Sequence, residues 1–171
     1  MEETVEHGLG SRGLDDEDGN QFLTFVLNDE EYGVDILKVQ EIKGWEEATE
    51  VPNTSDYVKG VINMRGTIIP IIDLRTRFSL ETKPPDRTTV VIILKVQTTD
   101  RERTVGLVVD AVAEVYNVNA DAVQPSPDFN GSIRSEYLMG LATIQEKMLI
   151  LLDVDRLVTD AIEEDGAREA A

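Results

Sequence analysis

The 171-residue sequence has no cysteine, one histidine and few aromatic residues. Without cysteine it has no disulfide framework, no thiolate metal site and no cysteine nucleophile, and a reducing compartment suits it best. The one histidine, His7, lies in an acidic N-terminal segment. A histidine-based triad or a multi-histidine metal site on the folded part is therefore excluded.

Long apolar runs are also missing, since none approaches the ~18 residues that a membrane span needs. The first residues, MEETVEHGLGSRG, are acidic and polar where a secretory signal is basic and then apolar. Neither export nor membrane insertion is supported, and we expect a cytoplasmic protein. The glycosylation sequons at Asn53 and Asn130 then carry no weight, and the G-x-G-x-x-G pattern at Gly8–Gly13 is interpreted as a linker because no strand precedes it.

The net charge of -18 is unevenly distributed. Residues 1–20 hold seven acids against one arginine, and residues 160–171 hold five acids against one arginine. We expect both ends to be solvated and disordered, which gives an acidic tail over 1–20, a folded domain over 21–158 and an acidic C-terminal tail over 159–171. The folded part stays acidic and repels nucleic-acid phosphates and anionic lipids.

Short β-branched runs, broken by turn residues about every ten residues, indicate an all-β fold with minor helices. The run Phe22–Leu27, the polar turn Asn28–Glu31 and the segment Tyr32–Val34 predict a hairpin. Pro70 lies inside the run Thr67–Ile72 and cannot donate a ladder hydrogen bond. That strand is therefore expected at a sheet edge or with a bulge at Pro70.

The chain also repeats itself. Gly33–Ile42 aligns without gaps with Gly106–Val115 at an offset of 73, and Gly60–Phe78 aligns with Gly140–Val158 at an offset of 80. The difference requires seven extra residues, for which the polar stretch 124–135 has room. Two matches in the same order favour a duplicated β unit, although short amphipathic strands can resemble one another by chance.

Chemistry is sparse in this sequence. Carboxylates are plentiful, so an acid-base pair stays open as an alternative and would require a concave acidic pocket. Asp73 and Asp153 each close an apolar strand, where we interpret them as acceptors of backbone hydrogen bonds at a turn or helix start. A second alternative, a ligand- or nucleic-acid-binding barrel, would require a basic or aromatic face, and the acidic composition with 5% aromatics argues against it.

Four segments, EEYGVDILKVQEI, GVINMRGTIIPIIDLRTRF, VGLVVDAV and SEYLMGL, resemble the CheW family of chemotaxis coupling proteins. The resemblance runs from about Gln21 to Leu157. Its most specific part is N-x-R-G followed by an apolar run, proline and D-L, and Met64 stands there where leucine is more usual. The acidic tails lie outside it.

The resemblance implies two pseudo-symmetric small five-stranded β-barrels around a shared interface. It also implies a non-enzymatic adaptor, without cofactor or metal, that links the cytoplasmic tips of methyl-accepting chemoreceptors to the histidine kinase CheA. Such a protein is cytoplasmic and is recruited to membrane receptor arrays.

Family positions implicated in receptor or kinase coupling correspond here to Val39, Glu41, Gly60, Arg65, Val90, Gly106 and Val115. Barrel packing alone could explain Val90 and Gly106. Val39 and Glu41 share a face if their strand is continuous, and a valine beside an acid suits contact with a helical receptor tip. Arg65-Gly66 predicts a turn, and Arg65 is expected to pair with Glu41.

Overall fold

The computed structural model describes residues 20–125 and 135–170. In chain order its elements are β1 (Asn20–Leu27), β2 (Glu30–Asp35), the one-turn 3₁₀ helix η1 (Ile36–Lys38), β3 (Val39–Gly44), β4 (Val58–Met64), β5 (Thr67–Asp73), α1 (Leu74–Arg77), β6 (Val90–Gln97), β7 (Glu102–Val109), β8 (Ala111–Val118), η2 (Ala120–Ala122), β9 (Val123–Gln124), η3 (Ser135–Tyr137), β10 (Leu138–Ile144), β11 (Lys147–Leu152) and α2 (Val154–Ala170). The predictions made on His7, on Gly8–Gly13, on Asn130 and on most of the stretch 124–135 lie outside the described residues.

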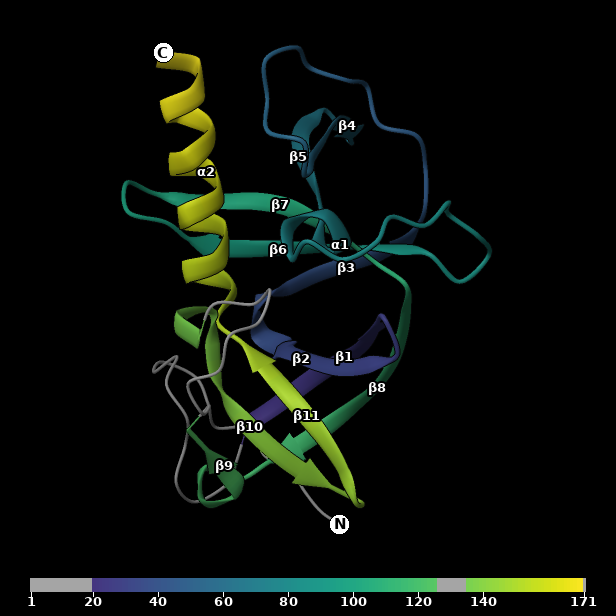
Figure 1. Cartoon of the computed structure of the whole chain (residues 1–171), viewed down its shortest axis with the longest axis vertical. Coiled ribbons are helices and arrows are strands. Elements are labelled where there is room, and N and C mark those ends of the chain that lie inside the picture. The colour runs from purple at the N-terminus through teal and green to yellow at the C-terminus, as the bar shows by residue number, and fades with distance from the viewer. Residues whose placement is uncertain (1–19, 126–134, 171) are drawn as a thin grey trace.

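The strands form two sheets, one above the other in Figure 1, with orders β3-β6-β7-β5-β4 and β8-β1-β2-β11-β10-β9. Each of the first five positions in one order corresponds to the same position in the other. The sixth strand, β9, has two residues, and its counterpart in the other sheet is an isolated bridge between Thr49 and Val61. The all-β prediction is confirmed, with two similar small sheets.

The duplication predicted from sequence is visible in the pairing register. In each sheet one pair of strands is parallel: Ile71 lies opposite Gly106, and Leu151 lies opposite Gly33. Gly106 follows Gly33 by 73 residues and Leu151 follows Ile71 by 80, which are the two offsets of the sequence repeat. Unrelated amphipathic strands would not reproduce both offsets in one pairing.

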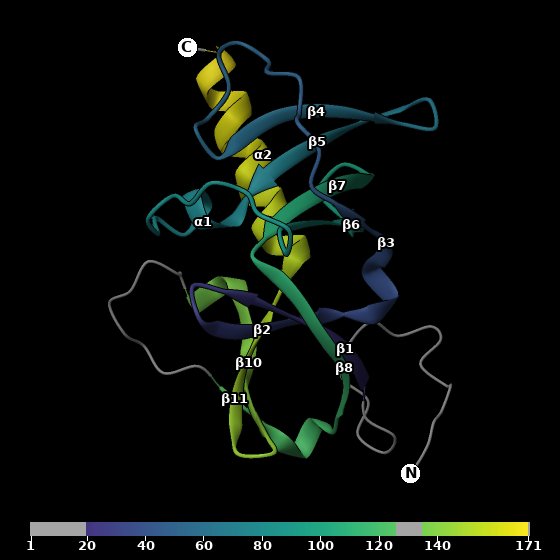
Figure 2. The same cartoon turned by 90° about the vertical axis from the view of Figure 1, so that its right-hand side faces the viewer.

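The two repeats exchange strands. β3 follows β2 in sequence but pairs with β6 of the second repeat, and β8 follows β7 but pairs with β1 of the first. Figure 2 shows β8 running from the upper to the lower sheet. Each sheet therefore contains strands from both repeats, so neither repeat can complete a sheet alone.

Two-residue turns with positive φ close the β1–β2 and β4–β5 hairpins. Asn28 and Asp29, with φ of 54° and 68°, connect β1 to β2, which confirms the predicted hairpin with a shorter turn. Arg65 and Gly66, with φ of 52° and 88°, connect β4 to β5. Positive φ at both central residues matches the right-handed twist of the flanking strands, and Asn, Asp and Gly adopt it at least cost.

The expectation for Pro70 was wrong. β5 lies inside its sheet between β7 and β4, and the nearest bulge lies on β4 between Val58 and Gly60. The partner of Pro70 on β4 is Val61, whose N–H and C=O both bond Thr49 instead. Pairing with β7 begins only at Ile71, so Pro70 sits where no ladder bond from its nitrogen is required.

The main core joins the sheets. It contains buried side chains of both sheets and both α-helices. The ring centre of Tyr32 lies 5.6 Å from that of Phe25 and 6.0 Å from that of Phe78. A smaller cluster lies within each sheet, with Ile69 and Ile71 in one and their repeat equivalents Leu149 and Leu151 in the other. The apolar surface buried between the sheets makes them one unit rather than two domains.

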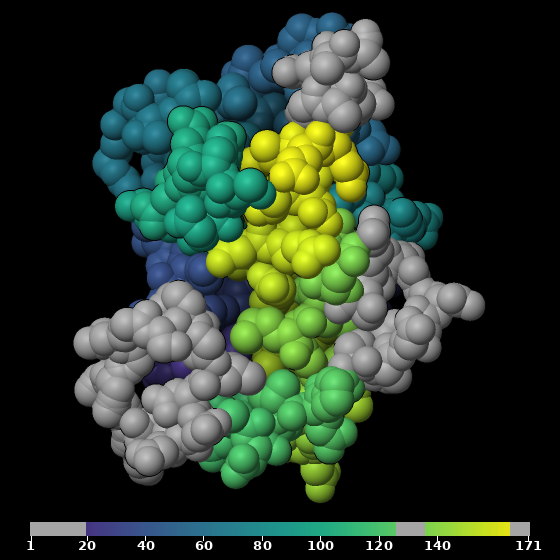
Figure 3. Space-filling model, turned by 90° about the vertical axis from the view of Figure 1, so that its left-hand side faces the viewer, coloured from purple at the N-terminus to yellow at the C-terminus, as the bar shows by residue number. Residues whose placement is uncertain are grey.

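The segment after residue 158, expected as an acidic tail, is helical, since α2 continues to Ala170. Val158 and Ala161 are buried in the main core, and Asp155 and Glu163 bond Gln97 and Thr99 at the β6–β7 end. Figure 3 shows α2 lying along the surface beside that hairpin. The acidic composition suggested a tail, but the apolar side of the helix decides its position. Within the described ranges, no helix combines the length and apolar character required to cross a bilayer.

Arg77 connects the two repeats to α2. Its guanidinium lies 4.7 Å from the ring centre of Tyr57 and 5.5 Å from that of Tyr137, two tyrosines related by the offset of 80. The same group donates to the Tyr137 hydroxyl at 2.8 Å and to both carboxylate oxygens of Glu164 at 3.1 Å. Burial opposes its charge, but Glu164 and the tyrosines outweigh that cost and raise the pKa of Arg77.

Replacing Arg77 with Met is expected to lower the free energy of unfolding by about 1–3 kcal/mol, measured by urea denaturation. The substitution removes two cation–π contacts and the ion pair of Glu164, which among the described residues keeps only its bond from the Tyr57 hydroxyl. Because Glu164 is half exposed, the loss stays below that of a fully buried pair. Arg156→Met is the control, because Arg156 is half exposed and its carboxylate contacts are 3.7 Å long. Equal effects of the two substitutions would contradict a central role for Arg77.

Candidate functional site

The residues predicted to couple partners lie mainly on the five-stranded sheet. They are Val39 and Glu41 on β3, Gly60 on β4, Arg65 in the β4–β5 turn, Val90 at the start of β6, Gly106 on β7 and, on the other sheet, Val115 of β8. The structure brings two of them into direct contact. The Arg65 Nη2 donates to Glu41 Oε1 at 2.7 Å, as the sequence predicted.

The N-x-R-G motif explains how Arg65 is presented. The Asn63 side chain accepts a hydrogen bond from the Gly66 N–H at 2.9 Å and so holds the tight turn. In that turn Arg65 is 71% exposed, and it reaches across to Glu41 of β3, which is 35% exposed. The motif therefore has two roles. The asparagine and glycine stabilise the turn, and the turn exposes the arginine side chain at the surface.

The ion pair sets the protonation of its carboxylate. The hydrogen bond from Arg65 lowers the pKa of Glu41 below its usual 4.5, and the charges of Arg65 and Lys43 act in the same direction. Glu41 in turn raises the pKa of Arg65. Both groups are charged at neutral pH, so this surface offers a fixed pair of opposite charges.

Exposed apolar residues of β3 and β5 have exposed apolar equivalents in the second repeat. Ile42 of β3 is 42% exposed and Ile68 of β5 is 58% exposed; their repeat equivalents, Val115 and Met148, are 47% and 57% exposed. The residues at the positions of Glu41 and Arg65 in the second repeat are Glu114 and Gln145. The two sheets therefore present similar apolar surfaces that differ in charge, because glutamine cannot replace the arginine charge.

Val115 was among the residues predicted from sequence, whereas Ile42, Ile68 and Met148 were not. Each lies in a run whose alternation marks inward and outward positions, and each has an apolar partner at the repeat offset. An apolar residue at an outward position in both repeats could have indicated an exposed apolar surface. We refer to Ile42 and Ile68 as the first apolar pair, and to Val115 and Met148 as the second.

Val39 and Glu41 were expected to share a face only if their strand, β3, were continuous. The pairing of β3 with β6 shows that it is not. Val39 lies opposite Leu94 and Glu41 opposite Ile93, so one extra residue, Gln40, is inserted in β3. Val39 packs against the main core. The equivalent bulge on β8 is stabilised by the buried hydroxyl of Thr24, which bonds both the N–H and the C=O of Glu114.

The two glycines of the predicted set are required by packing. An added Cβ at Gly60 would lie 2.1 Å from the Thr49 carbonyl oxygen, and Gly60 has φ of 139°. At Gly106 a Cβ would lie 2.7 Å from both Ile71 and Val91. Val90 also packs against the main core. A role for these three residues in binding stays a prediction.

Asp73 and Asp153 have the interpreted structural role. Asp73 accepts from the Arg75 N–H at 3.1 Å at the start of α1, and Asp153 accepts from the Arg156 N–H at 3.1 Å in the first turn of α2. Over 20–125 and 135–170, no group of three or more histidine, aspartate or glutamate side chains is arranged to hold a metal ion.

Titration of the Glu41 side-chain carboxyl by ¹³C NMR is expected to give a pKa below 4.5, and Arg65→Gln should move it back towards that value. Since the folded pKa is the lower one, the stabilising contribution of the pair is complete above the unfolded value of ~4.3 and is lost as pH falls through the folded pKa. Arg101→Gln, in the β6–β7 turn, should leave the titration unchanged. An unchanged Glu41 titration in Arg65→Gln would show that the pair does not form in solution.

Alanine substitution separates packing from binding at the glycines. Gly106→Ala is expected to lower the free energy of unfolding by about 1–3 kcal/mol through overpacking, and Gly60→Ala by at least as much because backbone atoms block its Cβ. Gly44→Ala is the control, since its Cβ would meet nothing within 4 Å. Urea denaturation decides: if Gly60→Ala and Gly106→Ala are as stable as Gly44→Ala, the packing explanation fails.

Comparison with known proteins agrees with this geometry. The family model described as "CheW-like domain" matches residues 21–161. The protein named "Chemotaxis protein CheW" from Klebsiella aerogenes is 47% identical over 141 residues, which cover 82% of each chain. A protein of the same name from Rhizobium meliloti is 35% identical over 137 residues, covering 80% of this chain and 86% of the relative.

Among solved structures, the scaffolding protein TtCheW from Thermoanaerobacter tengcongensis superposes with a TM-score of 0.73 at 32% identity. The match covers 81% of the present chain and 92% of that one.

Proposed function

The chain belongs to the CheW-like family and is a chemotaxis coupling adaptor, and we propose that it links methyl-accepting chemoreceptors to a CheA-type histidine kinase. The adaptor works without making or breaking a bond. Its action consists of holding two proteins in a defined relative geometry, which raises their effective concentration for each other. We further propose that it acts in the cytoplasm, at the receptor arrays of the membrane.

The observation that supports two partners is the duplicated surface. The first and second apolar pairs lie on different sheets, and both sheets share one core. A rigid body with two similar but differently charged surfaces suits two distinct partners, because charge discriminates between surfaces of like shape. Each interface needs to bury on the order of 1,000 Å² to be specific, and one apolar pair with its surroundings provides the centre of such an area.

We assign the receptor to the surface around Glu41 and Arg65. Receptor tips are helical, and a helix that docks on a strand surface needs apolar anchors and a polar contact that fixes its register. The first apolar pair supplies the anchors, and the ion pair supplies a charge of each sign. The pair itself is exposed, so solvent screening leaves it little weight in stability and its value lies in orientation.

The remaining predicted residues belong to this proposal in supporting roles. Gly60 and Gly106 allow close packing within the sheet that carries this surface. Val39 and Val90 lie between this surface and the core, and Val115 belongs to the second apolar pair, which we assign to the kinase. The second surface lacks the arginine, so it would accept a less charged, more apolar partner surface.

Charge reversal tests the assignment. Arg65→Glu is expected to reduce recovery of chemoreceptors in a pull-down by about 3- to 10-fold while kinase recovery changes little, because it places two acids together on one surface only. Recovery is measured from cytosolic and membrane fractions of the source cell by mass spectrometry, at low and moderate salt.

Two further variants complete this experiment. Arg101→Glu makes the same charge change in the β6–β7 turn and should behave as the wild type. The double variant Glu41→Arg with Arg65→Glu restores an ion pair of opposite sense and separates orientation of the turn from direct charge recognition. If Arg65→Glu is unfolded by circular dichroism, Arg65 is structural; if it is folded and binds receptors normally, the assignment of this surface is wrong.

A further inference from the structure

A cavity of about 230 Å³ lies beside the five-stranded sheet, away from the ion pair and the apolar pairs. It opens where the parallel strands β5 and β7 end, at the register pair Asp73–Val108. The segment Thr82–Pro85, between α1 and β6, forms one wall, and Trp45 from the end of β3 forms another. Its size is below the ~300–1,000 Å³ of most small-molecule sites, so a nucleotide-sized ligand is too large.

The cavity combines an apolar lining with two lysines. Trp45, Val108, Val109 and two prolines line it, together with Lys59 and Lys83. Each lysine makes one long contact of 3.7 Å, Lys59 with Asp73 and Lys83 with Asp86, and neither donates a hydrogen bond to a described residue. An ammonium group has three donors, so both lysines keep unused capacity.

The carboxylates around the cavity are already bound elsewhere. Asp110 accepts from Arg75 at 2.9 and 2.8 Å and from the Asn28 N–H at 2.9 Å. These bonds outweigh the burial of Asp110 and lower its pKa. Asp73 accepts from the Arg75 N–H and from Thr76.

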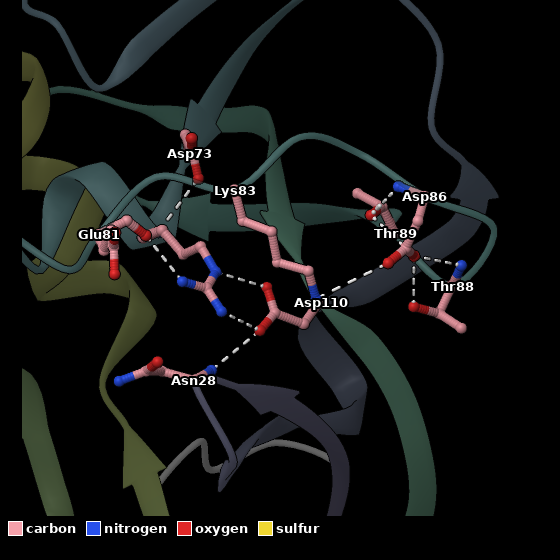
Figure 4. A network of polar contacts seen from close by, with 9 residues as sticks. Asn28, Asp73, Glu81, Lys83, Asp86, Thr88, Thr89 and Asp110 are labelled. Atoms are coloured by element: carbon pink, nitrogen blue, oxygen red, sulfur yellow. Dashed lines mark hydrogen bonds and ion pairs between the residues drawn. The ribbon is translucent and has the colours of Figure 1, made fainter.

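Asp86 is likewise held by its own loop, through the N–H and hydroxyl of Thr88 at 2.8 and 2.7 Å. Figure 4 shows Lys83 extended past Asp110 towards Asp86, where a dashed line marks its 3.7 Å ion pair, while Asp86 also accepts the shorter bonds from Thr88. The lysine ammonium groups, each with one long ion pair, therefore keep donor capacity for a ligand of this cavity.

The duplicated fold provides an internal comparison. At the repeat offset of 80, Met139 stands in place of Lys59, and Asp155 in place of Arg75. At the same offset, the wall Thr82–Pro85 corresponds to residues 162–165, which are helical as part of α2. The fold alone does not require the lysines or the wall, so a specific role is the simpler explanation for them.

We propose that this cavity binds a carboxylate carried on a short apolar stem, with Lys59 and Lys83 as its hydrogen-bond donors and Trp45 packed against the stem. The chemistry is shared by a free organic acid and by an acidic side chain beside an apolar one in a partner protein. Arg75 remains bonded to Asp110 and contributes to the lining of the cavity. The site is separate from the surfaces assigned to receptor and kinase.

Trp45 is the only tryptophan of the chain, so its fluorescence reports on this cavity directly. The full-length chain is titrated with 3-phenylpropionate and with the uncharged 3-phenylpropanamide, and with the peptides Ac-Phe-Glu-NH₂ and Ac-Phe-Gln-NH₂. At least one carboxylate probe is expected to change the fluorescence saturably and to shift the Trp45 indole resonance in ¹H–¹⁵N NMR spectra. Each matched amide should bind about tenfold more weakly, because a charge-assisted bond is lost.

Lys59→Gln and Lys83→Gln should each lower the affinity for the carboxylate probe about 3- to 10-fold. Lys95→Gln, which changes an exposed lysine of β6, should leave that affinity unchanged. Binding of the peptide alone would indicate a partner segment, and binding of 3-phenylpropionate alone would indicate a free acid. The proposal is overturned if neither carboxylate binds saturably, if an amide binds as tightly as its acid, or if both lysine variants bind as the wild type. The acid–amide comparison uses the wild type and decides the matter even if a variant does not fold.

Discussion

The structure depends on the guanidinium of Arg77, which lies between Tyr57 and Tyr137 and bonds Glu164. The two tyrosines are the same residue of the two repeats, so the contact sits where the repeats meet. A planar cation can face two aromatic rings while its edge bonds a carboxylate, which a lysine cannot do. One side chain thus fixes the relation of both sheets and holds α2 over their junction.

The exchange of strands makes that junction rigid. Since β3 and β8 each leave the repeat in which they begin, moving one sheet against the other requires pulling a strand from its ladder. The main core spans both sheets, so such a motion would also expose buried apolar surface. This rigidity suits an adaptor. Because a close-packed interior is hardly compressible, a displacement of one binding surface is transmitted to the other.

Duplication followed by divergence explains the surfaces. The first and second apolar pairs occupy equivalent positions, while Arg65 corresponds to Gln145 and Lys59 to Met139. Packing constrains the inward residues of both repeats in the same way, as Ile69 with Leu149 and Ile71 with Leu151 show. Outward residues are under no such constraint, and there the repeats have acquired different charges.

The sequence by itself determined the all-β class, the hairpin at Asn28-Asp29, the duplication with its two offsets, the turn at Arg65-Gly66 and the pairing of Arg65 with Glu41. The class, the hairpin and the turn depend on alternation and turn chemistry, which are local properties of the chain. The duplication is visible because one half of the sequence can be aligned with the other. Only the tertiary structure decided the exchange of β3 and β8, the interior place of Pro70, the bulge at Gln40, the helical course after residue 158 and the cavity at Trp45. Each of these depends on which distant segments pack together. Local sequence patterns do not predict that packing, because the free energy that stabilises it comes from contacts throughout the core.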